Sequence, residues 1–231
     1  MCERSNVKIL QVIPYYAWAY GGPVRVVYEL SHCLARKDHE ITIYTTNVGK
    51  TGRLTEDEKI VMDKAIDVKY FDCKSNWVAE RGKLHFSPQM RRTLKREVKC
   101  FDLVHIHEPR GISGVYAGHF ANKFGIPYLI QVHGASPLAL TGQSSIFKLC
   151  KICFDKILGQ DLLMGASHVI ALTETEASQY SRLHIPESKI TIIPNGINAL
   201  DYKEQPKPRA FRLLYGIPED QKIILFLGRI H

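Results

Sequence analysis

The residues best suited to chemistry lie where short apolar stretches of the sequence end. The pairs Gly21-Gly22, His107-Glu108 and His133-Gly134 each follow such a stretch. An imidazole accepts, donates or carries a proton near neutral pH, and a glycine lets the backbone approach a ligand closely. A helix that starts after Gly22 would also favour an anion at its first turn. These residue types predict a site for a polar or anionic ligand. For Gly21-Gly22 the alternative is that the two glycines are needed only to form a turn.

The first pair lies between an expected strand and an expected helix. Residues 7–13 are apolar throughout and rich in β-branched side chains, which is typical of a buried parallel strand. Pro23 suits the first turn of a helix, because the N–H that it lacks would have no partner there. Apolar residues then recur at helical spacing: Val26, Val27, Leu30, Cys33 and Leu34.

Strand-like and helix-like segments alternate along the rest of the chain. The expected strands are residues 39–46, 68–71, 102–107, 127–132, 167–172, 189–193 and 222–227. The expected helices start after the N-caps Ser87 and Thr173 or cover residues 112–124, 144–164 and 210–215, while residues 47–63 are a polar surface excursion. This alternation predicts an α/β fold with a doubly wound, Rossmann-like parallel sheet, in which ligands bind beyond the carboxyl ends of the strands.

A proline- and charge-rich stretch, residues 201–209, reads as a linker. We therefore expect an N-terminal domain over residues 1–200 and a linker with a short helix over residues 201–220. Residues 221–231 would begin a second domain, because so apolar a strand needs more chain to cover it. The chain would then hold only the first strand of that second domain.

Composition narrows the class of protein. With 45% hydrophobic and 23% charged residues, the 231-residue chain resembles an ordinary soluble protein. It lacks an apolar run of the roughly 20 residues that a membrane span needs, and its first residues lack the apolar core of a signal peptide. We therefore expect a cytoplasmic protein with reduced thiols, in which Cys150 and Cys153 pack in a core rather than form a redox or zinc site.

The formal net charge of +8 suggests a negatively charged binding partner. Residues 80–99 alone carry seven basic and two acidic side chains, a pattern that suits nucleic acid, an anionic membrane or a phosphorylated substrate, or simply a solvated helix face. Without interleaved aromatics or a known motif, we expect no nucleic acid. The apolar residues of 144–164 with their lysines, together with the basic helix at 91–99, favour peripheral association with an anionic membrane surface.

Metal and nucleophilic chemistry are weaker alternatives. His105 and His107 share one face of a strand and His133 would approach them, but this spacing is no established zinc pattern and no cysteine is near. We therefore expect no metal. The sequence also lacks a Gly-x-Ser-x-Gly motif and a Ser/His/Asp set, which argues against a serine nucleophile.

Five motifs in order carry a family resemblance: Tyr20-Gly21-Gly22-Pro23-Val24-Arg25, the stretch 102–107, Val132-His133-Gly134, Ile193-Pro194-Asn195-Gly196-Ile197 and Phe226-Leu227-Gly228-Arg229. Over nearly the whole chain they resemble the family-4 retaining glycosyltransferases of GT-B fold. In that family the N-terminal Rossmann-like domain mainly binds the acceptor, and the C-terminal one binds the nucleotide sugar. The resemblance implies sugar transfer from a UDP- or GDP-linked donor to a glycan or lipid-linked acceptor, with retained configuration and no further cofactor.

The resemblance also implies roles for single residues. His133 resembles the active-site histidine that contacts the donor sugar. Gly22, with Gly21, resembles the loop that approaches the donor diphosphate, and Arg229 resembles the arginine that neutralises the leaving diphosphate. Fixed N–H groups and a guanidinium suit that charge. On the acceptor side we expect the residues Arg25, His107, Glu108 and Gly134.

Other features of the family do not occur in this sequence. The lysine after the arginine and the pair of glutamates with seven residues between them would belong to the C-terminal domain. We therefore expect an acceptor-binding half that needs this domain in cis or in trans and is inactive alone. The alternatives are a non-catalytic binding domain, a subunit of a split glycosyltransferase, or a nucleotide-sugar epimerase, for which only Glu108 is a suitably placed carboxylate.

Overall fold

The structure is a computed structural model that describes residues 6–49, 52–73, 86–108, 111–134, 154–199, 203, 207 and 209–226. The chain divides into two units, residues 1–196 and 197–231. Each unit is described by itself. The domain boundaries expected from the sequence stay predictions.

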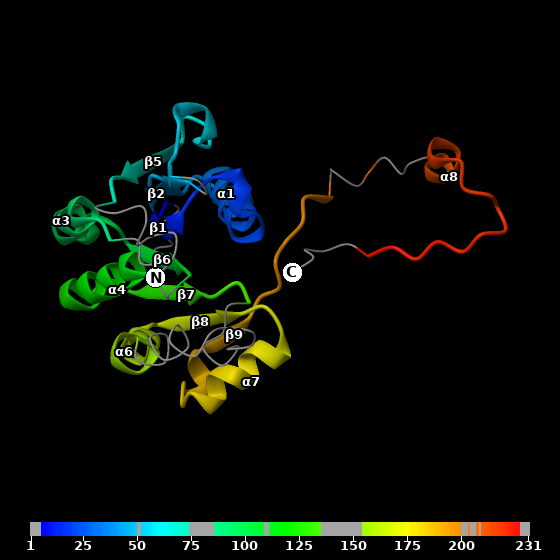
Figure 1. The fold of residues 1–231 in the computed structure, drawn as a ribbon. Helices are drawn as coiled ribbons and strands as arrows, with labels where there is room; N and C mark the ends of the chain where they lie inside the picture. The colour runs from blue at the N-terminus through cyan, green and yellow to red at the C-terminus, as the bar shows by residue number, and fades with distance from the viewer. Residues whose placement is uncertain are drawn as a thin grey trace. The chain divides into compact units, whose positions relative to one another are not determined.

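The first unit is built on a seven-stranded parallel sheet (Figure 1). Its strands are β1 (Lys8–Tyr15), β2 (Glu40–Thr46), β5 (Ile66–Phe71), β6 (Leu103–His107), β7 (Tyr128–Gln131), β8 (His168–Ala171) and β9 (Ile190–Ile192). Their order is β5-β2-β1-β6-β7-β8-β9. The chain runs outward from β1 in one direction and then returns to run outward from β6 in the other. Sequence alternation predicted this doubly wound sheet, and the prediction is confirmed.

Helices cover both faces of the sheet. Side chains from α1 (Gly22–Ala35) form one core with Ile9 and Ile13 of β1. Side chains from α3 (Pro88–Glu97), α4 (Ile112–Phe124) and α6 (Gln160–Gly165) form the other core, with alternate residues of β1 and β6. Figure 1 shows α1 on one side of the strands and α3, α4 and α6 on the other. The central strands β1 and β6 therefore have two buried faces, as their apolar sequences predicted.

The helix signals in the sequence act as expected. The Ser87 hydroxyl accepts a hydrogen bond from the Met90 N–H at 3.2 Å, which caps α3 ahead of Pro88. Helix α4 ends at Gly125, whose φ of 69° is left-handed. Thr173 caps α7 (Glu174–Arg182) through the Glu176 N–H, at 3.2 Å.

Residues 47–63 are less exposed than predicted. They include the two short strands β3 (Val48–Gly49) and β4 (Gly52–Arg53) and the 3₁₀ turn η2 (Glu56–Glu58). Val48, Leu54 and Ile60 are buried, so three apolar residues anchor a segment whose composition is mainly polar. The described residues form three further 3₁₀ turns, η1 (Trp18–Tyr20), η3 (Val98–Cys100) and η5 (Glu187–Lys189).

The long helix expected at 144–164 lies mostly outside the described residues, as do Cys150 and Cys153. From residue 154 the chain is helical, with a π-helical turn η4 (Asp155–Gly159) that leads into α6. Within the described residues, no helix combines the length and the apolarity that crossing a bilayer requires.

The second unit contains α8 (Ala210–Tyr215), which ends at Gly216 with a left-handed φ of 63°. Residues 222–226 form no strand, so the expected first strand of a second domain is wrong for these residues. A strand needs a neighbour to pair its N–H and C=O groups, and the described part of this unit offers none. Side chains such as Ile224 and Phe226 are exposed.

Candidate functional site

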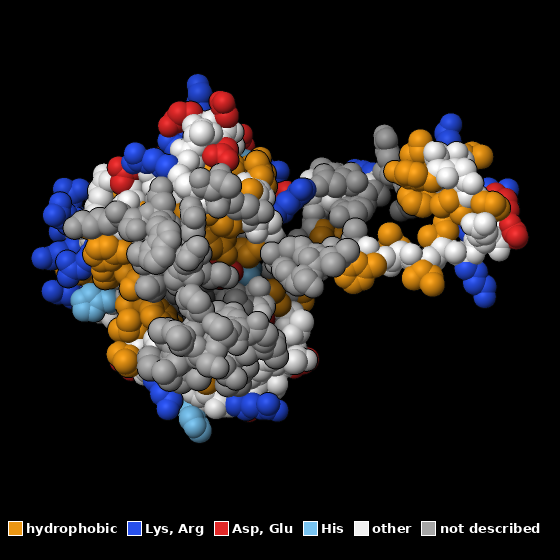
Figure 2. All heavy atoms as spheres, in the orientation of Figure 1, with side chains coloured by type: hydrophobic (Ala, Val, Ile, Leu, Met, Phe, Trp, Pro, Cys, Tyr) orange, Lys and Arg blue, Asp and Glu red, His pale blue; other side chains and the backbone are white. Residues whose placement is uncertain are grey.

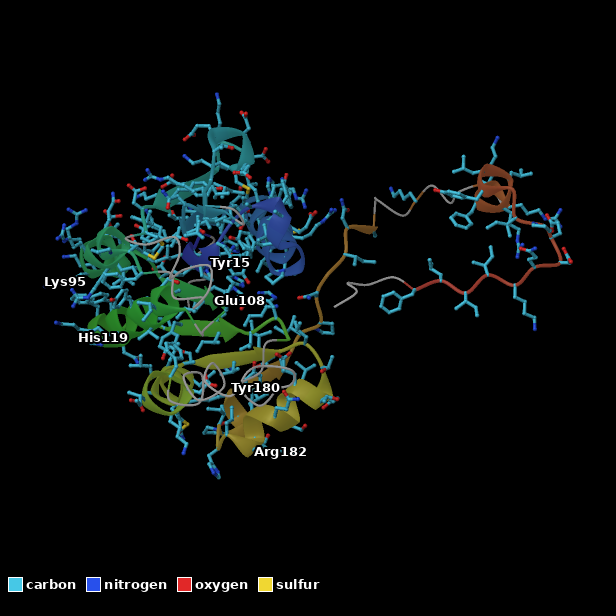
Figure 3. All side chains as sticks on the ribbon, in the orientation of Figure 1. Tyr15, Lys95, Glu108, His119, Tyr180 and Arg182 are labelled. Atoms are coloured by element: carbon cyan, nitrogen blue, oxygen red, sulfur yellow. The ribbon has the colours of Figure 1, made fainter. Side chains whose placement is uncertain are left out.

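The candidate site lies at the carboxyl ends of β1, β6 and β7. The order of the sheet reverses between β1 and β6, which pair directly. In open parallel sheets ligands bind at such a switch point. In Figure 3, Tyr15 marks the end of β1 and Glu108 the residue after β6.

The backbone takes an uncommon conformation just past these strands. Glu108 and His133 have left-handed φ values of 60° and 53°, and Gly21 and Gly134 have φ values of 79° and 80°. A residue with a side chain loses about 1–3 kcal/mol in such a conformation, and residues of this kind gather at functional sites. The backbone therefore supports a functional role for the loops that follow β6 and β7.

His133 contacts His107 directly. His107 Nδ1 and His133 Nε2 are 2.9 Å apart, and the two rings lie nearly parallel with an angle of 18° between them. The contact follows from the topology, because His107 ends β6 and pairs with Gln131 at the end of β7. The last residue of β6 and the turn after β7 thus bring the two imidazoles together.

A buried hydrogen-bond chain continues from His107 into α1. His107 Nε2 lies 3.0 Å from Gln11 Oε1, and Gln11 Nε2 donates to Ser31 Oγ at 2.8 Å. Ser31 then donates to the carbonyl oxygen of Val27 at 2.6 Å. Gln11, Ser31 and His107 are each 0% exposed, so every one of their polar groups depends on a partner within the protein.

Burial keeps the histidines of this region neutral. Desolvation lowers the pKa of His133 to about 4. Desolvation, with repulsion from His133, lowers the pKa of His105 to about 3. The pKa of His107 is lowered well below its ordinary value by desolvation and by both neighbouring histidines. At pH 7 each imidazole therefore has one N–H donor and one nitrogen acceptor.

Two imidazole nitrogens are left over. His133 Nδ1 and His105 Nε2 are buried and have no hydrogen-bond partner within the described chain. An unsatisfied buried polar atom is costly, so such an atom at a strand end indicates a place that a ligand fills. His133 Nδ1 is therefore the group of this site that is ready to meet a polar ligand.

The three histidines come together, but their arrangement does not fit a metal. The rings of His105 and His107 are 4.0 Å apart between centroids. Both nitrogens of His107 are already hydrogen-bonded, so metal ligation by that ring would break a bond to Gln11 or to His133. The described residues contain no group of three or more side chains with metal-binding geometry.

The glycine pair opens the α1 side of the site. Gly21 precedes α1 and Gly22 is its first residue. A Cβ atom added at either glycine would meet nothing within 4 Å, so the space beside this turn is open. The first turn of the 14-residue helix α1 presents unpaired N–H groups there. Arg25, one turn along, is exposed and lies 3.4 Å from the Glu29 carboxylate.

The remaining predicted site residues differ in how far they are exposed. Gly134 is exposed and Glu108 is half-buried, both at the strand ends. His107 is placed differently from the predicted acceptor contact, because its ring is fully buried with both nitrogens bonded. Its position suits support of His133 instead. Arg229 lies outside the described residues.

Sequence reasoning missed Gln11, Ser31 and Gln131. Gln11 and Gln131 interrupt otherwise apolar strands, and Ser31 follows Val27 by one turn on the buried side of α1. A polar residue in a strand buried on both faces is the signal that would have found the two glutamines, and a serine on the buried side of a helix is the signal for Ser31. Gln131 Nε2 donates to Asn195 Oδ1 at 3.3 Å, which brings Asn195 to the end of β7.

Comparison with known proteins gives a family. The model of Glycosyltransferase Family 4 matches residues 20–199. A phosphatidyl-myo-inositol mannosyltransferase of Mycolicibacterium smegmatis is 25% identical over 96% of this chain and 51% of its own length. A D-inositol 3-phosphate glycosyltransferase of Kineococcus radiotolerans is 22% identical over 91% of this chain and 48% of its own length. This chain thus spans about half the length of these relatives.

Solved structures agree on the fold. The Anabaena protein Alr3699/HepE, in a complex with UDP and glucose, matches with a TM-score of 0.60 at 16% identity, over 91% of this chain and 50% of its own. A UDP-N-acetylglucosamine 2-epimerase from Rickettsia bellii matches with a TM-score of 0.50 at 13% identity, over 82% of this chain and 45% of its own. At these identities the likeness shows the fold alone. The family match rests on sequence and spans most of the first unit, so this chain belongs to glycosyltransferase family 4.

Proposed function

We propose that this chain is the acceptor-binding half of a glycosyltransferase that moves a sugar from a nucleotide sugar to an acceptor with retained configuration. The observation that carries the proposal is the family match together with His133, a neutral imidazole at the switch point of the sheet whose buried Nδ1 has no hydrogen-bond partner within the described chain. The activity needs a C-terminal domain in cis or in trans, because the chain spans about half of its relatives.

In this proposal His133 binds a hydroxyl of the donor sugar. The turn at Gly21-Gly22 and the first N–H groups of α1 face the donor diphosphate, whose negative charge grows as the sugar departs. The guanidinium of Arg229 stabilises the same negative charge. No metal or further cofactor is needed, since the N–H groups and the guanidinium supply the electrostatic stabilisation.

UDP is the nucleotide that we favour, with GDP as the alternative. The solved complexes of the Anabaena protein with UDP, and with UDP-glucose, support a UDP-linked donor. The names of the two curated relatives point to acceptors that carry an inositol phosphate. An anionic acceptor of this kind suits the net charge of +8 and the exposed Arg25 beside the glycine turn.

We also propose that the chain works at an anionic membrane surface on the cytoplasmic side, with a lipid-linked acceptor. Helix α3 buries Met90 and Leu94 in the core and turns an exposed basic face outward. This basic face consists of Arg91, Arg92, Lys95 and Arg96 of α3, with Lys99 of the following turn η3. Figure 2 shows basic side chains gathered along one edge of the first unit, and Lys95 is labelled there in Figure 3. Such a face attracts anionic lipids.

A transfer assay tests the proposed function. Radiolabelled UDP-glucose and GDP-mannose are offered with inositol 3-phosphate or phosphatidylinositol vesicles, to the chain alone and to the chain joined to a family C-terminal domain. We expect labelled acceptor only in the joined form, and the anomeric configuration of the product, read by NMR, should match that of the donor. A joined form that folds and binds UDP but labels no acceptor would contradict the proposal.

A further inference from the structure

The hydrogen-bond chain from Val27 to His133 has a fixed direction. The carbonyl oxygen of Val27 only accepts, so the Ser31 hydroxyl at 2.6 Å must donate its single proton to it. Ser31 Oγ is then an acceptor toward Gln11, and the Gln11 atom that faces it at 2.8 Å must be the amide nitrogen. The backbone of α1 thereby sets the orientation of a buried amide.

The orientation of the Gln11 amide also fixes which ring nitrogens of the two histidines carry a proton. With its nitrogen toward Ser31, Gln11 presents Oε1 to His107 Nε2 at 3.0 Å, so Nε2 must carry the proton of that ring. Because His107 is neutral, its Nδ1 is an acceptor. His133 Nε2, 2.9 Å away, must therefore donate. The proton of neutral His133 lies on Nε2, and Nδ1 is left as a bare acceptor.

We propose that Ser31, Gln11 and His107 are positioning residues that hold His133 as its Nε2–H tautomer, so that Nδ1 accepts a hydrogen bond from a hydroxyl of the bound sugar. The identity of the ligand as a sugar rests on the proposed function. The unpartnered, buried Nδ1 atom is the independent observation that points to a hydroxyl donor at this place. A hydroxyl meets this need because it donates one proton without adding charge.

If the hydrogen bonds of this chain ran in the opposite direction, the site would bind a different kind of ligand group. If Gln11 turned its amide over, its NH₂ group would face His107 Nε2 and force that nitrogen to accept. The His107 proton would then lie on Nδ1 and be donated to His133 Nε2, and the His133 proton would lie on Nδ1. His133 would then present a donor in place of an acceptor. The Ser31 hydroxyl on α1 therefore decides whether His133, three hydrogen bonds away, presents an acceptor or a donor.

Nitrogen NMR of the histidine rings tests the proposal on the whole chain without any sugar. The ¹⁵N shift of a ring nitrogen that carries a proton differs widely from that of one that does not, so long-range ¹H–¹⁵N spectra identify each tautomer. At pH 7 we expect the Nε2–H tautomer for His107 and His133. In Ser31→Ala and in Gln11→Met, we expect His133 to shift toward the Nδ1–H tautomer, with the backbone spectrum still that of a folded protein.

Ser113→Ala is the matched control. Ser113 is a buried serine in the first turn of α4, 1% exposed, and its hydroxyl has no hydrogen-bond partner within the described chain. Its replacement makes the same chemical change as Ser31→Ala and should leave the His133 tautomer unaltered. The proposal is overturned if His133 of the natural chain is mainly Nδ1–H, or if neither Ser31→Ala nor Gln11→Met changes it.

These outcomes separate the positioning proposal from the proposed function. A wrong tautomer removes the positioning role of Ser31 and Gln11 and leaves glycosyl transfer untouched. A correct tautomer in a joined enzyme that transfers no sugar would instead count against the function, while the hydrogen-bond chain would stand.

Discussion

The two faces of the central strands β1 and β6 are equally buried but differ in chemistry. Toward α3 and α4 the buried side chains of the two strands are apolar: Leu10, Val12, Val104 and Ile106. Toward α1, alternate positions of the same strands include Gln11, His105 and His107, which are 0–5% exposed. One face can be explained by packing alone. The other keeps polar groups where apolar ones would pack as well, which indicates that it carries the function.

The largest effect that we expect is on the apolar face. Ile106 is 0% exposed in the core with α4, so Ile106→Ala should lower the free energy of unfolding by about 2–5 kcal/mol through lost burial and a cavity. Urea unfolding followed by circular dichroism measures this change. The control Ile157→Ala makes the same change at a residue that is 66% exposed, and should stay within about 0.5 kcal/mol. Equal losses in both variants would contradict an apolar face that acts through packing.

A second effect should appear in catalysis and not in stability. His133→Ala in the two-domain enzyme removes the acceptor Nδ1 from the site and should lower kcat by about tenfold to a thousandfold, with a cooperative melt retained. His119 is an exposed histidine on α4, labelled in Figure 3, and His119→Ala should keep full activity. Full activity of His133→Ala would remove His133 from the catalytic machinery. Loss of its cooperative melt would make the residue structural.

The polar face should also make the fold sensitive to acid. The pKa of His133 is about 4 and the pKa of His105 is about 3 in the native state, against about 6.5 when unfolded. Between these values the unfolded chain binds more protons, so the free energy of unfolding falls as the pH drops below 6.5. Each histidine contributes up to about 1.4 kcal/mol per pH unit.

Denaturant unfolding at pH values from 7 to 4.5 measures this slope. His133→Gln removes one of the titrating groups and should make the slope shallower, while Ile157→Ala should leave it as in the natural chain. If His133→Gln retained the full slope, the acid sensitivity would come from groups other than His133.

The smallest effect concerns the exposed basic face of α3, which lies outside both cores. Each lysine or arginine near an anionic membrane contributes about 1 kcal/mol to binding. Arg92→Glu combined with Lys95→Glu should therefore reduce flotation with phosphatidylglycerol vesicles, and more strongly at low than at physiological salt.

Lys37→Glu combined with Lys64→Glu is the control for this basic face. It makes the same change of net charge at exposed lysines that lie outside α3. Equal flotation of the two double variants would show that the overall charge acts and not the face of α3. No flotation of the natural chain at either salt level would reject the membrane contact.

Much of the fold was predictable because its signals are local. Alternating apolar strands and helices gave the parallel sheet, and Ser87, Thr173 and Gly125 mark helix ends where the sequence places them. The helix α1 was harder, since its buried face comprises Val24, Val27 and Ser31, while the expected Cys33 is exposed. A small error in the angle of a helical face moves the predicted core by one residue, because successive side chains are about 100° apart.

The candidate site was predictable only in part. Strand ends and a family resemblance were enough to select Gly22 and His133. The resemblance could not find Gln11 or Ser31, because their role depends on which strands become neighbours: Gln11 meets His107 across 96 positions of sequence. Residues 222–226 of the expected strand form no strand for a related reason, since strand propensity does not create a pairing partner.

The left-handed backbone at Glu108 and His133 also limits which substitutions these two positions tolerate. A β-branched or bulky residue rarely adopts such a φ, whereas glycine, asparagine and aspartate do so with less loss. A saturation library at position 133 that is sorted only for folded protein should therefore enrich glycine and asparagine above histidine. Sorting the same library for sugar transfer should return histidine. The difference between the two enrichment profiles would measure how much stability the protein loses by keeping an imidazole at this position.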